Sequence, residues 1–174
     1  MNLQPLYEQQ KVLDEHIIEE HGLHWENLLP RKILALQVEL GELANEWRGF
    51  KFWSWDQEPR GKEWADRLGE MRNPLLEEYV DCLHFILSIG LELGYDEVNF
   101  PIFYERQSDN IIEQFNKLFD KTGDFSRYKT TGNYKMILSL FSGLGEMLGF
   151  TWKEVEQAYE FKNAINHERQ NTGY

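Results

Sequence analysis

The sequence has one cysteine, no long apolar run and few basic residues. Because Cys82 has no partner in the chain, an internal disulfide is excluded and a reducing compartment is expected. No apolar run reaches the roughly 18 residues of a membrane span, and no basic region followed by an apolar run opens the sequence. We therefore expect a cytoplasmic protein that does not bind membranes.

The shortage of basic residues sets the charge of the chain. With 18 Lys and Arg against 30 Asp and Glu, the formal net charge is -12, so a nucleic acid partner is not expected. A hydrophobic content of 41% and six Trp argue against disorder. The 174 residues are enough for one domain, 1–174, and a flat helical domain of this size can also dimerise.

Three acids share one face of a predicted helix over residues 35–47. Glu39, Glu42 and Glu46 fall within an arc of about 60°, because residues three and four apart stack on one side of a helix. Leucines border this stripe, so the acids lie beside the surface that the helix buries. An exposed, solvated face is the simplest alternative interpretation of such a pattern.

A second acidic pair makes the solvated face a weaker explanation. Glu78 and Asp81 point to the same side as Cys82 on a helix that is apolar nearly all round after Asp81. Buried carboxylates are normally protonated, paired or bound to a metal. Together with Glu39 and Glu42, the pair Glu78 and Asp81 offers an all-oxygen site, which suits Mg²⁺ and phosphate chemistry. Glu46 and Glu77 are either further ligands or exposed residues. On this apolar helix, Cys82 is expected to be a core residue and not a nucleophile.

The remaining pattern is helical throughout, with no alternating strand pattern. We predict an all-α fold, a helical bundle built around the two acidic helices and expected to dimerise. Residues 56–74 are predicted to be a long connection that includes at most a short helix, and 121–132 a turn region. The predicted helices cover residues 3–21, 30–48, 75–93, 101–119, 133–148 and a last one that opens at 151–154.

Several other residues are candidates for substrate contact. Gln10 can read a base edge through its amide, although surface glutamine is the default interpretation. Trp25 lies in a predicted loop and is either a wall of a base pocket or a core residue. The aromatic segment Phe50–Trp55 either caps a pocket, with Lys51 reaching a phosphate, or forms a hydrophobic dimer patch.

The last helix carries Lys162, Asn166 and Arg169 within an arc of about 60°. Cations near a helix C-terminus are explained by the helix dipole alone. Beside an acidic metal site, however, a Lys, an amide and an Arg are what a polyphosphate requires.

Three motifs together resemble a known family. They are Glu39-x-x-Glu42, Glu78-x-x-Asp81 followed by His84-Phe85, and the terminal segment 162–174. In this order they resemble the dimeric all-α dUTPase family, part of the all-α NTP pyrophosphatase superfamily that includes MazG-like enzymes. The resemblance implies hydrolysis of dUTP to dUMP and pyrophosphate by a homodimer.

The resemblance also implies roles for individual residues. Roughly one to three Mg²⁺ ions are implied at the four acids, with Glu39 or Glu42 activating the attacking water. Glu78 follows Glu42 by 36 positions, a long interval for the superfamily, which leaves Glu77 as an alternative ligand. Lys51, Lys162, Asn166 and Arg169 are implied at the phosphates, and Gln10, Trp25 and His84 near the nucleoside.

Two other functions remain open at this point. Another MazG-like NTP pyrophosphatase, such as a dCTPase, shares the metal site but not the base pocket. A non-catalytic helical interaction protein would instead use Phe50–Trp55 as its contact surface, and it would show no hydrolysis.

Overall fold

The computed structural model describes residues 2–61, 63–64, 71–96 and 109–173 of the chain. These residues contain six α-helices and one antiparallel pair of two-residue strands, in which Glu63 pairs with Arg72 and Trp64 with Met71. The elements in chain order are α1 (Gln4–His21), α2 (Leu29–Trp47), β1 (Glu63–Trp64), β2 (Met71–Arg72), α3 (Pro74–Glu92), α4 (Ile111–Arg127), α5 (Thr131–Met147) and α6 (Trp152–Thr172).

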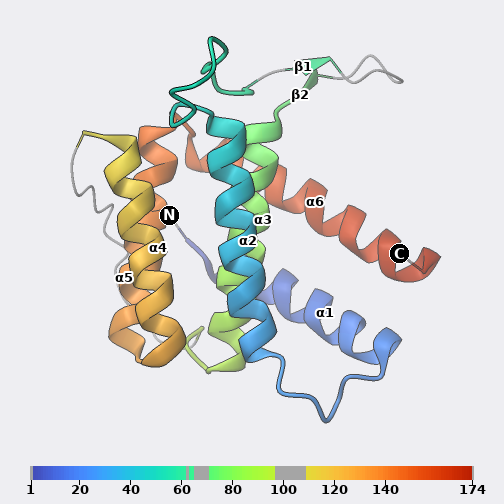
Figure 1. Cartoon of the computed structure of the whole chain (residues 1–174). Helices are drawn as coiled ribbons and strands as arrows, with labels where there is room; N and C mark the ends of the chain where they lie inside the picture. The colour runs from blue at the N-terminus through green and yellow to red at the C-terminus, as the bar shows by residue number, and fades with distance from the viewer. Residues whose placement is uncertain (1, 62, 65–70, 97–108, 174) are drawn as a thin grey trace.

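The two acidic helices lie at the centre of the fold. In Figure 1, α2 and α3 run side by side in the middle, with α4 and α5 on the left and α1 and α6 on the right. Helix α3 contacts α1, α2, α5 and α6, so one helix connects both sides. The predicted all-α bundle around two acidic helices is confirmed. Among the described helices, none is both long and apolar enough to span a membrane.

Helix α3 is central because its sequence is apolar on nearly every side. Its first turn contains Pro74, and the Asn73 side chain accepts a hydrogen bond from the Leu76 amide at 3.1 Å. Cys82 is fully buried in the core, where burial raises the pKa of its thiol well above the usual value. The interpretation of Cys82 as a core residue is therefore confirmed.

Helix α4 differs from its prediction. The predicted end near Phe119 and the predicted turn at 121–127 are wrong, because α4 continues to Arg127 with Gly123 inside it. The helix starts after Asn110, whose side chain accepts a hydrogen bond from the Ile112 amide at 2.9 Å. Its apolar stripe packs on α5, and this burial outweighs the low helix propensity of one glycine. Residues 101–108 of the predicted helix lie outside the described residues.

The segment after α2 lies at the top of Figure 1, beyond the end of the bundle, and it carries exposed aromatic side chains. Helix α2 ends at Trp47, and the next residue, Arg48, caps it in a left-handed conformation with φ 65°. Contacts with Asp56 stabilise this conformation, because Arg48 Nη2 donates to the Asp56 carbonyl at 2.9 Å and lies 3.2 Å from its carboxylate. Beyond it, Phe52 and Trp55 are among the most exposed large apolar side chains of the described residues.

Candidate active site

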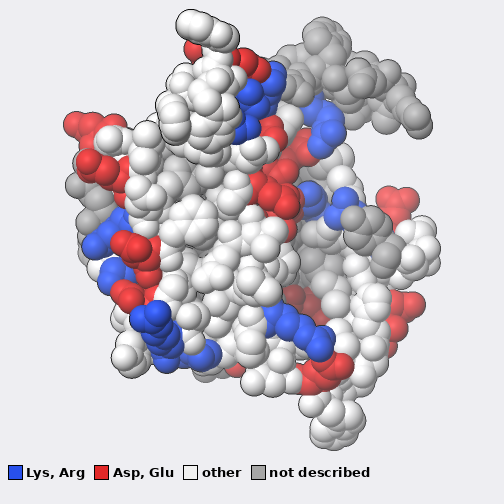
Figure 2. Space-filling model, viewed as in Figure 1, with Lys and Arg blue, Asp and Glu red and all other residues white. Residues whose placement is uncertain are grey.

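A group of three carboxylates lies between the central helices. Glu39 of α2 and Glu78 and Asp81 of α3 each have one carboxylate oxygen within 4.8 Å of the other two. All three side chains are half-buried, so the acids predicted to point inward face a partly enclosed site. In the view of Figure 2, acidic side chains gather near the upper middle of the surface, close to basic ones.

Burial and mutual repulsion make these acids hard to ionise. Partial burial, then the charge of Asp81, raises the pKa of Glu39 from 4.5 to about 7. The same two causes raise the pKa of Glu78 to about 7. Burial also raises the pKa of Asp81, although Lys162 opposes this shift. Acids held together at this cost are typical of a functional site.

The donor set fits a hard divalent cation. Each acid offers an oxygen ligand from a helix, and hard cations such as Mg²⁺ prefer oxygen. Glu42 is exposed one turn beyond Glu39, outside the group of three, but its charge also raises the pKa values of Glu39 and Glu78. Glu77 forms an ion pair with Arg72. Of the two neighbouring glutamates, Glu78 and not Glu77 therefore belongs to the group.

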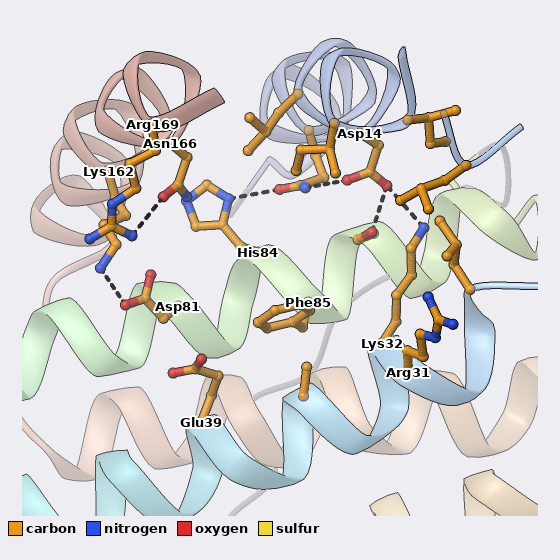
Figure 3. Close-up of a pocket in the computed structure, with 18 residues that line it drawn as sticks. Asp14, Arg31, Lys32, Glu39, Asp81, His84, Phe85, Lys162, Asn166 and Arg169 are labelled. Atoms are coloured by element: carbon orange, nitrogen blue, oxygen red, sulfur yellow. Dashed lines mark hydrogen bonds and ion pairs between the residues drawn. The ribbon is translucent and has the colours of Figure 1, made fainter. Parts of the chain in front are cut away.

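Cationic and amide side chains of α6 lie beside the carboxylates. Lys162 Nζ donates to Asp81 Oδ2 at 2.5 Å, with both side chains 17% exposed. Arg169 and Asn166 are half-buried on the same helix, and Arg169 Nη1 donates to Asn166 Oδ1 at 3.4 Å. Figure 3 shows all three pointing toward the carboxylate side of α3. A cationic wall therefore faces an anionic one across the site.

A pocket with a volume of about 410 Å³ adjoins these groups. It extends between α1, α2, α3 and α6, and its walls include Leu13, Ile17 and Phe85. Both Glu39 and Asp81 line one end of it. Small-molecule sites commonly have this size and this mixture of apolar walls with a few polar groups.

Two buried polar residues form one wall of this pocket. Gln10 is 3% exposed and His84 is 5% exposed, so the interpretation of Gln10 as a surface residue is wrong. Gln10 Oε1 lies 2.7 Å from His84 Nδ1 and accepts a hydrogen bond from the Tyr159 hydroxyl at 2.7 Å. The His84 ring stacks on Tyr159 with their centroids 4.1 Å apart. Burial lowers the pKa of His84 to about 3, so its ring is neutral at physiological pH.

The sequence did not point to three residues that line the pocket, Asp14, Lys32 and Ser88. Asp14 accepts hydrogen bonds from Gln10 Nε2 at 2.7 Å, from Ser88 Oγ at 2.5 Å and from Lys32 Nζ at 3.2 Å. The available signal was spacing. Asp14 follows Gln10 by one helical turn and Ser88 follows His84 by one turn, which places each pair on one helix face.

Two predicted substrate residues lie away from the pocket wall. Trp25 is 98% exposed in the loop between α1 and α2. Lys51 Nζ donates to Asn45 Oδ1 at 2.5 Å and lies 5.8 Å from the centroid of the Phe50 ring. Neither residue lines the 410 Å³ pocket, and their roles at the substrate stay predictions.

Comparison with known proteins identifies a family for the whole described site and fold. A family model described as dUTPase matches residues 2–174. No curated protein matches the chain.

Proposed function

Because this chain belongs to the all-α dimeric dUTPase family, we propose that it hydrolyses dUTP to dUMP and pyrophosphate with the help of Mg²⁺. Family membership makes it a nucleotide hydrolase, and the proposal adds the substrate, the metal and the residue roles. The observation that carries it is the group of three carboxylates, two of which, Glu39 and Asp81, line a pocket of about 410 Å³ together with Lys162. The whole chain, 1–174, is treated in this proposal as one domain.

The carboxylates would hold the cation and accept the proton. Glu39, Glu78 and Asp81 supply the ligands, and Glu42 is close enough to contribute charge. When bound, Mg²⁺ neutralises phosphate charge and increases the acidity of water. Of the two glutamates predicted to activate water, we assign the role to Glu39, because it belongs to the carboxylate group and also lines the pocket. In the metal-free site its pKa of about 7 lies in the range of a general base acting at neutral pH, and a bound cation would lower it.

The α6 side chains would bind the triphosphate. Lys162 and Arg169 carry positive charge, and Asn166 offers an amide, all on the pocket side of the helix. Charge-assisted hydrogen bonds of this kind position a phosphate and stabilise the charge that moves to the leaving group. Gln10 and His84 line the same pocket, where the nucleoside would lie.

The proposal is tested by pyrophosphate release from dUTP, dCTP, dTTP and UTP, each with Mg²⁺ and with EDTA. We expect release from dUTP alone and only with Mg²⁺, because a pocket built for one base edge rejects analogues strongly. Glu39→Gln should lose this release. Glu113→Gln, which removes the charge of an exposed acid on α4, is the matched control for that variant. Release from dCTP instead would identify a dCTPase, and no release from any nucleotide would favour an interaction protein.

Two further parts of the proposal concern assembly and location. We propose a homodimer that uses the exposed aromatic segment Phe50–Trp55, in which Trp53 is 65% exposed. We also propose a cytoplasmic location, which is supported by a single cysteine, buried and free.

A further inference from the structure

A chain of hydrogen bonds runs from Asp14 through Gln10 to His84 along the pocket wall (Figure 3). Asp14 Oδ1 is 2.7 Å from Gln10 Nε2, and Gln10 Oε1 is 2.7 Å from His84 Nδ1. An ionised carboxylate only accepts, so the Gln10 amide directs its NH₂ group toward Asp14 and its carbonyl toward His84. Because a carbonyl also only accepts, Nδ1 of His84 must carry the proton.

The other oxygen of Asp14 is fixed by two donors. Ser88 Oγ donates to Oδ2 at 2.5 Å, and Lys32 Nζ lies 3.2 Å from the same atom. Lys32 also pairs with Glu92 at 2.8 Å, which holds its ammonium group in place. These contacts favour an oxygen acceptor at Oδ2 and leave Oδ1 for Gln10. The Asp14 carboxylate therefore connects α1, α2 and α3 and, together with the Tyr159 hydroxyl that donates to Gln10 Oε1 at 2.7 Å, sets the direction of the hydrogen bonds.

One nitrogen of His84 remains available for a ligand. With the proton on Nδ1 of a neutral ring, Nε2 carries a lone pair and is an acceptor. Among the described residues, this buried atom has no hydrogen-bond partner. In Figure 3 the ring lies between Asp14 and Asn166, and the nitrogen bonded to Gln10 is on the Asp14 side. An unpaired buried acceptor destabilises the free protein, and a ligand donor that reaches it would remove that cost.

We propose that Asp14 is a positioning residue for nucleoside recognition: through Gln10 it fixes His84 as the Nδ1–H tautomer, so that Nε2 accepts a hydrogen bond from an N–H or O–H group of the nucleoside. The identity of that nucleoside rests on the proposed function. The tautomer of His84 follows from the protein alone, so it is measured independently of any activity.

Asp14→Asn is a sharp test because it keeps the size of the side chain. Lys32 and Ser88 donate toward one oxygen of Asp14, so the carbonyl of an Asn side chain would face them. Its NH₂ group would then face Gln10, and the Gln10 amide would turn over to present its oxygen. The Gln10 NH₂ group would face His84, Nδ1 would become the acceptor, and the proton would move to Nε2.

The direct measurement is ¹⁵N NMR of the histidine rings, with His84 assigned by its absence in His84→Gln. We expect the Nδ1–H tautomer in the wild-type protein and in Glu92→Gln, a control that changes a partner of Lys32 but not Asp14. In Asp14→Asn we expect Nε2–H. An Nε2–H or doubly protonated ring in the wild type at pH 7 would overturn the proposal, as would an unchanged tautomer in folded Asp14→Asn.

Kinetics with altered nucleotides identify the donor. N3-methyl-dUTP lacks the base N–H, and 2′,3′-dideoxy-UTP lacks the sugar 3′-hydroxyl. We expect the wild type to lose roughly 10- to 100-fold in kcat/KM on one of them, and Asp14→Asn to lose a similar factor on dUTP itself but little more on that analogue. If Asp14→Asn keeps wild-type discrimination, Asp14 has only a structural role. If the wild type hydrolyses no dUTP, the proposed function fails, and the NMR result still decides the tautomer.

Discussion

Lys162 of α6 forms a hydrogen-bonded ion pair with Asp81, one of the three acids of the carboxylate group, with 2.5 Å between Nζ and Oδ2. The contact joins the helix proposed to bind phosphates to the helix proposed to bind the cation. Lys162 therefore partly neutralises the site of the free protein, and it opposes the rise in the pKa of Asp81. The same positive charge is expected to repel a metal ion and attract a triphosphate.

Replacing Lys162 should change these two affinities in opposite directions. In Lys162→Met at pH 8, we expect metal-ion binding without nucleotide to strengthen roughly 3- to 10-fold, because a nearby positive charge is lost. The KM for dUTP should rise roughly 10- to 100-fold, because a charge-assisted phosphate contact is lost. Calorimetry with Mn²⁺ or Mg²⁺ and steady-state kinetics measure the two effects.

The matched control for that pair of measurements is Lys153→Met, an exposed lysine near the start of the same helix. It removes the same charge from α6 far along the chain from Lys162. If Lys162→Met does not strengthen metal binding more than Lys153→Met does, or if it leaves the KM unchanged, the proposed division of charge is wrong.

Glu39→Gln and Glu42→Gln should show which of the two glutamates binds the cation or accepts the proton. We expect Glu39→Gln to lower kcat at least ~100-fold, because it removes both a cation ligand and the assigned proton acceptor. Glu42→Gln should also stop turnover if Glu42 is a ligand or base, as the sequence predicts, while the fold stays intact. If Glu42→Gln stays active and Glu39→Gln does not, the catalytic role of Glu42 is wrong; activity of folded Glu39→Gln would refute the assignment of Glu39.

The stability of the metal-free protein should depend on pH because of the acids whose pKa values are raised. The folded-state pKa of Glu39 is about 7 against an ordinary value of 4.5, so between these pH values the folded state binds more protons than the unfolded state. Each such group lowers the free energy of unfolding as the pH rises through this window. His84 acts in the opposite direction, because its pKa is lowered from 6.5 to about 3. Between these pH values the unfolded state binds more protons, so His84 increases the free energy of unfolding as the pH rises.

A comparison between variants isolates the glutamate effect from that of His84. Gln is neutral at every pH, so the increase in Tm of Glu39→Gln over the wild type in EDTA should be small near pH 4.5 and grow up to about pH 7. Saturating Mg²⁺ should stabilise the wild type more at pH 8 than at pH 5, because the cation binds the ionised acids. A pH-independent difference in Tm would show that Glu39 is not destabilised by its surroundings.

The sequence was most informative where residue spacing maps directly onto a helix face. The acids of α2 and α3 were found because a spacing of three residues places carboxylates beside apolar neighbours. The end of α4 was missed because the tertiary packing of Phe115, Leu118 and Phe125 on one buried stripe outweighs the signal of Gly123. A local pattern contains no information about that partner surface.

The pocket shows the same limit in its polar residues. Gln10 and His84 were candidates individually, but their hydrogen bond joins residues 74 positions apart, which spacing within one helix cannot reveal. Asp14 was missed because an acid on an amphipathic helix is normally solvated. Its half-buried position depends on Lys32 and Ser88, which come from two other helices.

The exposed aromatic segment gives the last prediction, which concerns assembly. Phe50 and Phe52 pack edge-on against Trp53 with centroid distances of 5.7 and 5.0 Å, and Trp55 is fully exposed. Stable interfaces bury roughly 800 Å² on each partner and commonly centre on aromatic residues. Trp53→Asp should therefore shift a dimer toward monomer in light scattering measured over a range of concentrations.

The control for assembly is Tyr128→Asp, which places the same charge at an exposed aromatic residue beyond the end of α4. A monomeric wild type would refute the dimer proposal. If Trp53→Asp remains dimeric but its KM for dUTP rises, the segment caps the pocket and does not form the interface. That outcome would favour a phosphate role for Lys51, which belongs to the same segment.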